Sequence, residues 1–243
     1  MTLNIAETPA SLALQAANWV AAYMEQTLAK QPRFTVALSG GSTPKALHEL
    51  LAQPPLRNRI DWNRVHVFWG DERFVPFSDE KNNARMACET LLNHVPVPPA
   101  QIHAMKTDLP PAESMVEYEQ LLHTYFDNQP HTFDLVLLGL GDDGHTLSLF
   151  PGTAVVHEQR TWTEAFYLEQ QAMYRLTLTA PVVNRAAAVV FLVAGAAKAE
   201  AVREVLQGPY QPDKFPAQQI RPITGQTVWF LDRAAAARLP THT

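Results

Sequence analysis

A histidine and an aspartate two residues apart could carry acid–base chemistry in the segment LLGLGDDGHTLSLFPG, residues 137–152. Apolar residues typical of a buried strand lead into Gly139 and Gly141, and Asp143 and His145 follow directly. An imidazole exchanges protons near neutral pH, and a neighbouring carboxylate can fix its tautomer and stabilise its charged form. We therefore expect a proton-transfer site here, with TLSLF continuing as a helix. As an alternative, Asp142 and Asp143 serve only to cap that helix.

A second segment, SGGST, has the composition of an anion-binding turn. It follows the strand-like stretch RFTVALS and precedes a helix-like one. Gly40 and Gly41 would let backbone N–H groups approach a phosphate, and the helix dipole favours negative charge there. Ser42 and Thr43 could add hydroxyl donors, or could simply cap the helix. The turn matches neither G-x-x-x-x-G-K-[ST] nor G-x-G-x-x-G, so a dinucleotide is disfavoured, and we expect no cofactor.

Two cations follow two further strand-like stretches. Arg73 ends VHVFWGDER and Lys198 ends VVFLVAGAAK. An arginine can clamp a phosphate at two points, whereas a lysine acts as a point charge. Asp71 and Glu72 could line the same pocket, or could only pair with Arg73. Alone, each cation is more typical of a solvated surface residue.

Other chemistries fit the sequence poorly. It has no G-x-S-x-G segment for a serine hydrolase, and His48-Glu49 lacks the second histidine of H-E-x-x-H. No Cys/His cluster has zinc spacing, so we expect no metal site. The net charge of −5 and the lack of a basic stripe argue against a nucleic-acid partner.

The composition also suggests a compartment. A single cysteine, Cys88, excludes an internal disulfide and suits a reducing cytoplasm. The N-terminal MTLNIAETPA lacks the cationic start and apolar core of a signal peptide. No stretch approaches the ~18 uninterrupted apolar residues of a spanning helix. We expect a cytoplasmic protein without a membrane partner, and a monomer or weak homo-oligomer.

Alternating strand and helix patterns must position these residues. They predict one α/β domain over residues 1–243, with a doubly wound, mostly parallel sheet and helices on both faces. TWTEAFYLE and YRLTLTA alternate as antiparallel strands do, which predicts a small β-rich insert around 155–180. TVWFLD and RAAAARL are expected to close the chain as strand and helix. Ligands of such sheets bind beyond the carboxyl ends of the strands, so four strand ends should meet at one rim.

Five segments, taken in order, resemble the 6-phosphogluconolactonases of the soluble bacterial and eukaryotic type. They are ALSGGSTPKAL, FWGDERFVP, LLGLGDDGHTLSLFPG, RLTLTAPVVNRAAAVVFLVAGAAKAEAV and VWFLD, and the likeness runs from about residue 10 to 235. The resemblance implies a Rossmann-like fold, related to glucosamine-6-phosphate deaminases and ribose-5-phosphate isomerases. It implies metal-free hydrolysis of 6-phospho-D-glucono-1,5-lactone, a sugar-phosphate lactone, in the oxidative pentose phosphate pathway. The general base would be His145 and its acidic helper Asp143, with Asp71 in the same pocket and the phosphate on Gly40, Gly41, Ser42, Arg73 and Lys198.

Two positions depart from the family pattern, and two alternatives stay open. Leu147 stands where a small residue is usual and should affect helix packing. Asn82-Asn83 stands where a Ser-Asn pair is common and could alter a substrate contact. An aminosugar-phosphate deaminase or isomerase is disfavoured because SLFPG offers no carboxylate. A non-catalytic sugar-phosphate sensor is disfavoured by the His145–Asp143 pair.

Overall fold

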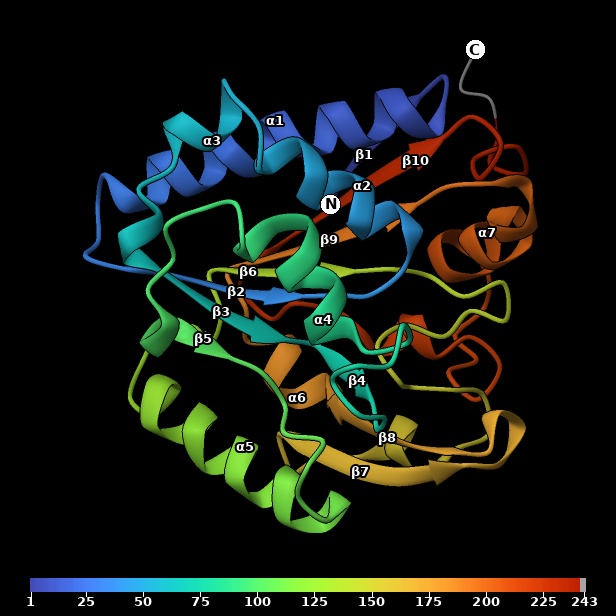
Figure 1. Cartoon of the computed structure of the whole chain (residues 1–243). Coiled ribbons are helices and arrows are strands. Elements are labelled where there is room, and N and C mark those ends of the chain that lie inside the picture. Colours follow the sequence, from blue (N-terminus) through green and yellow to red (C-terminus); the bar gives the residue numbers. More distant parts are fainter. Residues whose placement is uncertain (241–243) are drawn as a thin grey trace.

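Seven parallel strands form the central sheet of the computed structural model, which describes residues 1–240 (Figure 1). The last three residues of the expected domain lie outside the described ones. Every neighbouring pair in the sheet is parallel, which confirms the predicted mostly parallel α/β class. Across the sheet the strands are β1 (Thr2–Ala6), β10 (Gln226–Asp232), β9 (Ala188–Val193), β6 (Leu135–Leu138), β2 (Phe34–Leu38), β3 (Val65–Trp69) and β5 (Ile102–His103).

Helices cover both faces of this sheet, as predicted. Successive strand residues point to opposite faces, so Val36 and Leu38 of β2 join one apolar cluster and Ala37 joins the other. The first face is covered by α1 (Pro9–Leu28), α2 (Ser42–Leu51), α3 (Leu56–Arg59) and α4 (Asn83–Ala87). The second is covered by α5 (Pro111–Phe126), α6 (Ala180–Val183) and α7 (Ala199–Gln207). Among residues 1–240, no helix has the length and apolar composition that a membrane crossing requires.

Shorter helical turns complete the chain. A π-turn, Cys88–Leu92, extends α4. The 3₁₀ turns are Trp62–Arg64, Pro99–Gln101, Ala154–His157, Glu169–Gln171, Ala196–Lys198 and Pro216–Gln219.

A small antiparallel sheet packs against the second face. Its strands lie in the order β4 (Asp71–Arg73), β8 (Met173–Leu178) and β7 (Thr163–Leu168). The β7–β8 hairpin agrees with the β-rich insert predicted around 155–180. Gly70 joins the two sheets, because its N–H donates to Leu38 O and its carbonyl accepts from Leu178 N, both at 2.8 Å. The sequence had placed Asp71–Arg73 only at the end of a strand, whereas here it begins a strand of the second sheet.

Two predicted helices are wrong. TLSLF does not form a helix but a tight turn, in which Thr146 and Leu149 form an isolated β-bridge. Leu147 has φ +54°, a left-handed conformation that a right-handed helix cannot include. RAAAARL forms successive turns, because N–H groups there bond three residues back, Ala237 to Ala234 and Leu239 to Ala236.

The strand order creates a switch point between β2 and β6. From β2 the chain proceeds to β3 and β5 on one side, and from β6 it proceeds to β9 and β10 on the other. Ligands of doubly wound sheets bind at the crevice outside the carboxyl ends of two such strands. The loops after β2 and β6 carry the SGGST and GDDGH segments, respectively, so the topology brings both to one place.

Candidate active site

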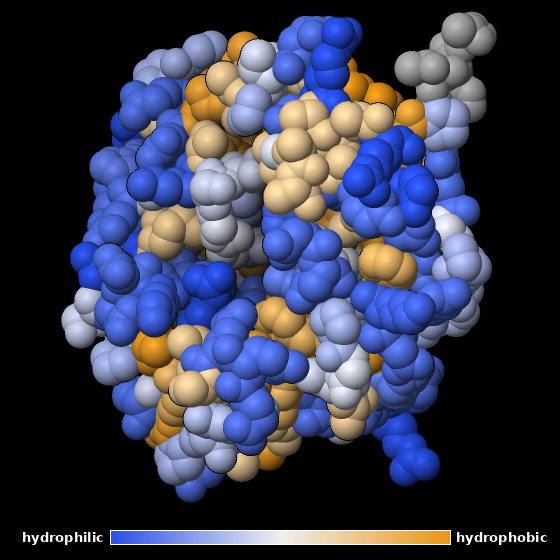
Figure 2. All heavy atoms as spheres, turned by 90° about the vertical axis from the view of Figure 1, so that its right-hand side faces the viewer, coloured by the Kyte–Doolittle hydropathy of each residue, from blue (hydrophilic) through white to orange (hydrophobic). Residues whose placement is uncertain are grey.

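A cavity of about 300 Å³ lies at the switch point, on the edge of the molecule shown face-on in Figure 2. That face is largely hydrophilic and is hollowed near its middle. The cavity gathers residues from four strand ends that are distant in sequence. Of the residues expected from the sequence, it is lined by Gly40, Gly41, Ser42, Thr43, Asp71, Arg73, His145 and Lys198. Asp143 stands beside His145 and does not line the cavity itself.

Asp143 and His145 form a hydrogen-bonded dyad. Nδ1 of the imidazole lies 2.6 Å from Oδ1 of Asp143, and the backbone N–H of His145 donates to the same oxygen at 3.0 Å. Burial raises the pKa of Asp143, but the hydrogen bonds from His145 and its charge outweigh that effect and lower the pKa overall. The carboxylate therefore stays ionised and accepts the Nδ1 proton, which leaves Nε2 free to accept another.

Close packing beneath and beside the dyad fixes its position. A β-carbon on Gly141 would lie 2.0 Å from His145 Nδ1 and 2.3 Å from Asp143 Oδ1, so a larger residue there would displace the dyad. Gly141 N also donates to His145 O at 2.8 Å, which closes the loop on itself. The Phe150 ring stacks on the imidazole, with 4.2 Å between centroids. The ring plane of His145 is therefore held from two sides.

The turn after β2 leaves the N-terminus of α2 open. Gly41 is the N-cap residue with φ +106°, which favours glycine, and no side chain of the described residues caps the helix. Pro44 has no N–H, so the uncapped donors of the first turn are those of Ser42 and Thr43. Both residues line the cavity. The positive end of the helix dipole and these unpaired N–H groups make a site for an anion.

Asn83, which the sequence analysis did not assign to the site, supports that turn from the side. Its Nδ2 donates to Asp71 O at 2.9 Å, and its amide lies so close to Gly40 that a β-carbon there would meet Oδ1 at 1.9 Å. Asn82 does not line the cavity. Its side chain accepts from Arg85 N at 2.8 Å as the N-cap of α4, a role that serine performs equally well, so this departure from the family pattern conserves the local structure.

Glu72, which is buried beneath the cavity wall, holds the segment that carries Asn83. The buried carboxylate accepts from the backbone N–H groups of Arg73, Asn83 and Ala84 at 2.7–2.9 Å. Burial raises its pKa to about 7 despite these donors, and the charge of Asp71 adds to the rise. Glu72 thus ties β4 to the start of α4 and does not reach the cavity.

Two cations at the cavity are lightly engaged. Arg73 Nη1 donates to Lys81 O at 3.1 Å, while its buried Nε has no partner within residues 1–240. Lys198 is half-buried beside the start of α7, and its ammonium forms no ion pair with the described part of the chain. Both therefore remain available to an incoming anion.

A buried ion pair, also missed by sequence reasoning, forms the wall beside Phe150. Arg175 Nη2 donates to Asp71 Oδ2 at 2.7 Å, and Ser148 Oγ donates to the same oxygen at 2.8 Å. Burial raises the pKa of Asp71, but Arg175, Arg73 and Ser148 together lower it below its usual range. Arg175 lies directly opposite Arg73 in the β4–β8 ladder, so Asp71 offsets two like charges. The signal available in the sequence was that Arg175 is the one charged residue of the alternating stretch YRLTLTA.

No group of three His, Cys, Asp or Glu side chains within residues 1–240 is arranged to hold a metal ion. The hydrogen-bond donors that surround the cavity are instead amides, hydroxyls and cations, with one imidazole. Such a set suits a phosphorylated, hydroxyl-rich organic molecule.

Comparison with known proteins gives consistent matches. Residues 7–229 match the family model described as glucosamine-6-phosphate isomerases/6-phosphogluconolactonase. The chain is 43% identical over 219 residues to a 6-phosphogluconolactonase of Synechocystis sp., with 88% of each chain covered. It is 38% identical over 243 residues to a 6-phosphogluconolactonase of Nostoc sp., with 98% of each covered. The solved structure of the 6-phosphogluconolactonase from Trypanosoma brucei matches with a TM-score of 0.87 and 27% identity, covering 98% of each chain.

Proposed function

The chain belongs to the glucosamine-6-phosphate isomerase/6-phosphogluconolactonase family, and we propose that it hydrolyses 6-phospho-D-glucono-1,5-lactone to 6-phosphogluconate in the oxidative pentose phosphate pathway. The observation that carries the proposal is one cavity that joins the His145–Asp143 dyad to an open helix N-terminus and two available cations. The lactonase names of the relatives support the same reaction.

The dyad supplies the proton transfers in this proposal. Nε2 of His145 takes a proton from water as the water oxygen attacks C1 of the lactone. The imidazolium then gives that proton to the ring oxygen as the bond from C1 to the ring oxygen breaks. Asp143 holds the Nδ1 proton and stabilises the transient positive charge. General acid–base catalysis of this kind contributes ~10²–10⁴-fold.

The 6-phosphate is held away from the reacting carbon. The N–H groups and hydroxyls of Ser42 and Thr43 bind its oxygens, and Lys198 and Arg73 balance its charge. Binding energy gained there positions C1 over His145 and so serves the chemical step. The Gly40-Gly41 turn lets the phosphate approach the backbone.

A direct assay tests the proposal. Purified protein should hydrolyse the phosphorylated lactone above its spontaneous rate, and should release no ammonia from glucosamine 6-phosphate. His145→Ala should lose most of kcat while retaining affinity for 6-phosphogluconate. Ammonia release without lactone hydrolysis would instead establish the deaminase alternative. Binding of 6-phosphogluconate without any turnover would establish the sensor.

We further propose a cytoplasmic protein that is monomeric or weakly self-associating. The sole cysteine, Cys88, supports the first part, because the chain offers it no disulfide partner and free thiols suit a reducing compartment. Fractionation of cells and analytical ultracentrifugation test the two parts separately.

A further inference from the structure

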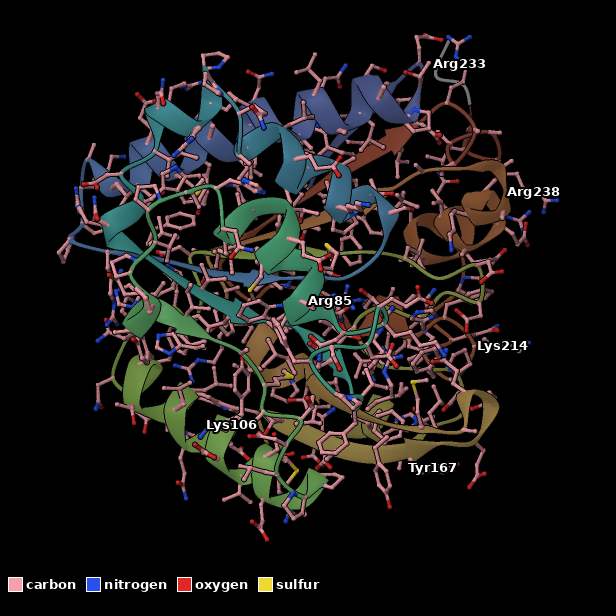
Figure 3. All side chains as sticks on the ribbon, in the orientation of Figure 1. Arg85, Lys106, Tyr167, Lys214, Arg233 and Arg238 are labelled. Carbon is pink, nitrogen blue, oxygen red and sulfur yellow. The ribbon has the colours of Figure 1, made fainter. Side chains whose placement is uncertain are left out.

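Gln171 reaches the cavity from outside the seven-stranded sheet. It ends the 3₁₀ turn Glu169–Gln171 that joins β7 to β8, and Ala172 follows in a left-handed conformation. The outer side of the same hairpin points elsewhere: Tyr167 on β7 lies at the surface, 44% exposed (Figure 3). Gln171 and its neighbour Gln170 are both exposed, but only Gln171 lines the cavity.

The orientation of the Gln171 amide follows from its partner. Arg175 Nη1 donates to Gln171 Oε1 at 3.0 Å. A guanidinium has only donors, so it can bind the amide oxygen and not the amide nitrogen. Nε2 therefore faces away from Arg175, and its two N–H donors have no partner within the described chain.

Arg175 is buried and bonded on several sides, so it gives the Gln171 amide oxygen a well-positioned donor. It is 3% exposed, and its Nε donates to Ser148 Oγ at 3.0 Å while Nη2 is paired with Asp71. Its guanidinium carbon lies 5.6 Å from the centre of the Phe150 ring, the ring that also stacks on His145. Gln171 is thus hydrogen-bonded to the wall that holds the dyad.

We propose that Gln171 is a specificity-determining residue that donates a hydrogen bond to a hydroxyl oxygen on the carbon chain of the lactone, an inference that rests on the proposed function. Arg175 is paired with Asp71, and the group that this wall presents to the cavity, the Gln171 amide, is an uncharged donor. A neutral amide suits a hydroxyl, whereas the phosphate has the α2 N-terminus, Arg73 and Lys198. In the lactone, C2, C3 and C4 carry the hydroxyls that lie between C1 and the phosphate.

The test compares kcat/KM for the parent lactone with that for its 2-deoxy, 3-deoxy and 4-deoxy analogues, all phosphorylated at C6. We expect the wild-type protein to prefer the parent over one analogue by roughly 3–10-fold, the effect of one neutral hydrogen bond. Gln171→Ala should abolish that preference. Gln171→Glu, which keeps an oxygen for Arg175 but removes the donors, should abolish it too. The added carboxylate could repel the phosphate, but this effect is the same for the parent and the analogues and therefore cancels in the ratio of their kcat/KM values.

Gln170→Ala is the matched control and should keep the wild-type preference. The inference would be overturned if Gln171→Ala preferred the parent lactone over each of the three analogues as strongly as the wild-type protein does. So would weaker inhibition by inorganic phosphate in that variant, because it would assign Gln171 to the phosphate end. A wild-type protein with no lactonase activity would instead overturn the proposed function.

Discussion

One carboxylate oxygen, Oδ1 of Asp143, accepts two hydrogen bonds from His145, one from the imidazole Nδ1 at 2.6 Å and one from the backbone N–H at 3.0 Å. The oxygen is therefore held by two donors of the same residue. The side chain of Asp143 cannot rotate without breaking both bonds at once. This arrangement fixes the imidazole before any substrate enters.

Asp143→Asn should keep the geometry and lose the charge. Both donors require an acceptor, so the asparagine should turn its oxygen toward them. We expect kcat to fall roughly tenfold, the difference between a charged and a neutral hydrogen bond, whereas His145→Ala should lose ~10²–10⁴-fold. Steady-state kinetics measure both. An Asp143→Asn protein with unchanged kcat would show that the charge plays no part.

Lys198→Ala should raise KM without changing kcat, because the ammonium is expected to bind a group far from C1. A lost hydrogen bond between charged groups predicts an increase of about 10- to 100-fold. The control is Lys214→Ala, whose lysine is exposed at the right-hand edge of Figure 3 and does not line the cavity. Equal KM values for the two variants would remove Lys198 from the phosphate site.

Gly141→Ala should displace the dyad, since the added β-carbon would lie 2.0 Å from His145 Nδ1. Misplacement of a catalytic group by about 1 Å can cost ~10²-fold in rate. Gly139→Ala is the control, because Gly139 also lines the cavity but no atom of residues 1–240 lies within 4 Å of a β-carbon there. Activity should fall in the first variant alone, while circular dichroism reports folded protein in both. Full activity of Gly141→Ala would contradict the close packing described here.

Stability should fall on the acid side because of His48. The side chain is fully buried in α2, its Nε2 has no partner within residues 1–240, and burial lowers its pKa from 6.5 to about 4. The neutral form stabilises the fold above pH 6.5, and this contribution is lost as pH falls toward 4, by about 3 kcal/mol in all. Urea unfolding as a function of pH measures it. His48→Leu should flatten this part of the profile, and the exposed His94→Leu should not.

The residues that the sequence singled out for the site mostly converge on one cavity, whereas two of the helices predicted around them are wrong. Glycines, an imidazole and cations at strand ends converge because parallel strands place their carboxyl ends on one edge. Arg175 could not be assigned, since its partner Asp71 is 104 residues away and the pair depends on the β4–β8 register. The helix predicted through TLSLF was wrong because apolar composition does not reveal that Leu147 has a left-handed backbone conformation. That residue is buried at 5% exposure, so its burial offsets the strain.

Within residues 1–240, the β7–β8 hairpin pairs with β4 and with no strand of the seven-stranded sheet. The part of the chain that we assign to substrate recognition is therefore modular. Its turn can change length or composition without altering the strand pairing of the parallel core, provided that Arg175 keeps its place in β8 beside Asp71 and Phe150. Natural variation or a directed library confined to residues 169–172 would thus explore new lactone substrates on an unchanged catalytic frame.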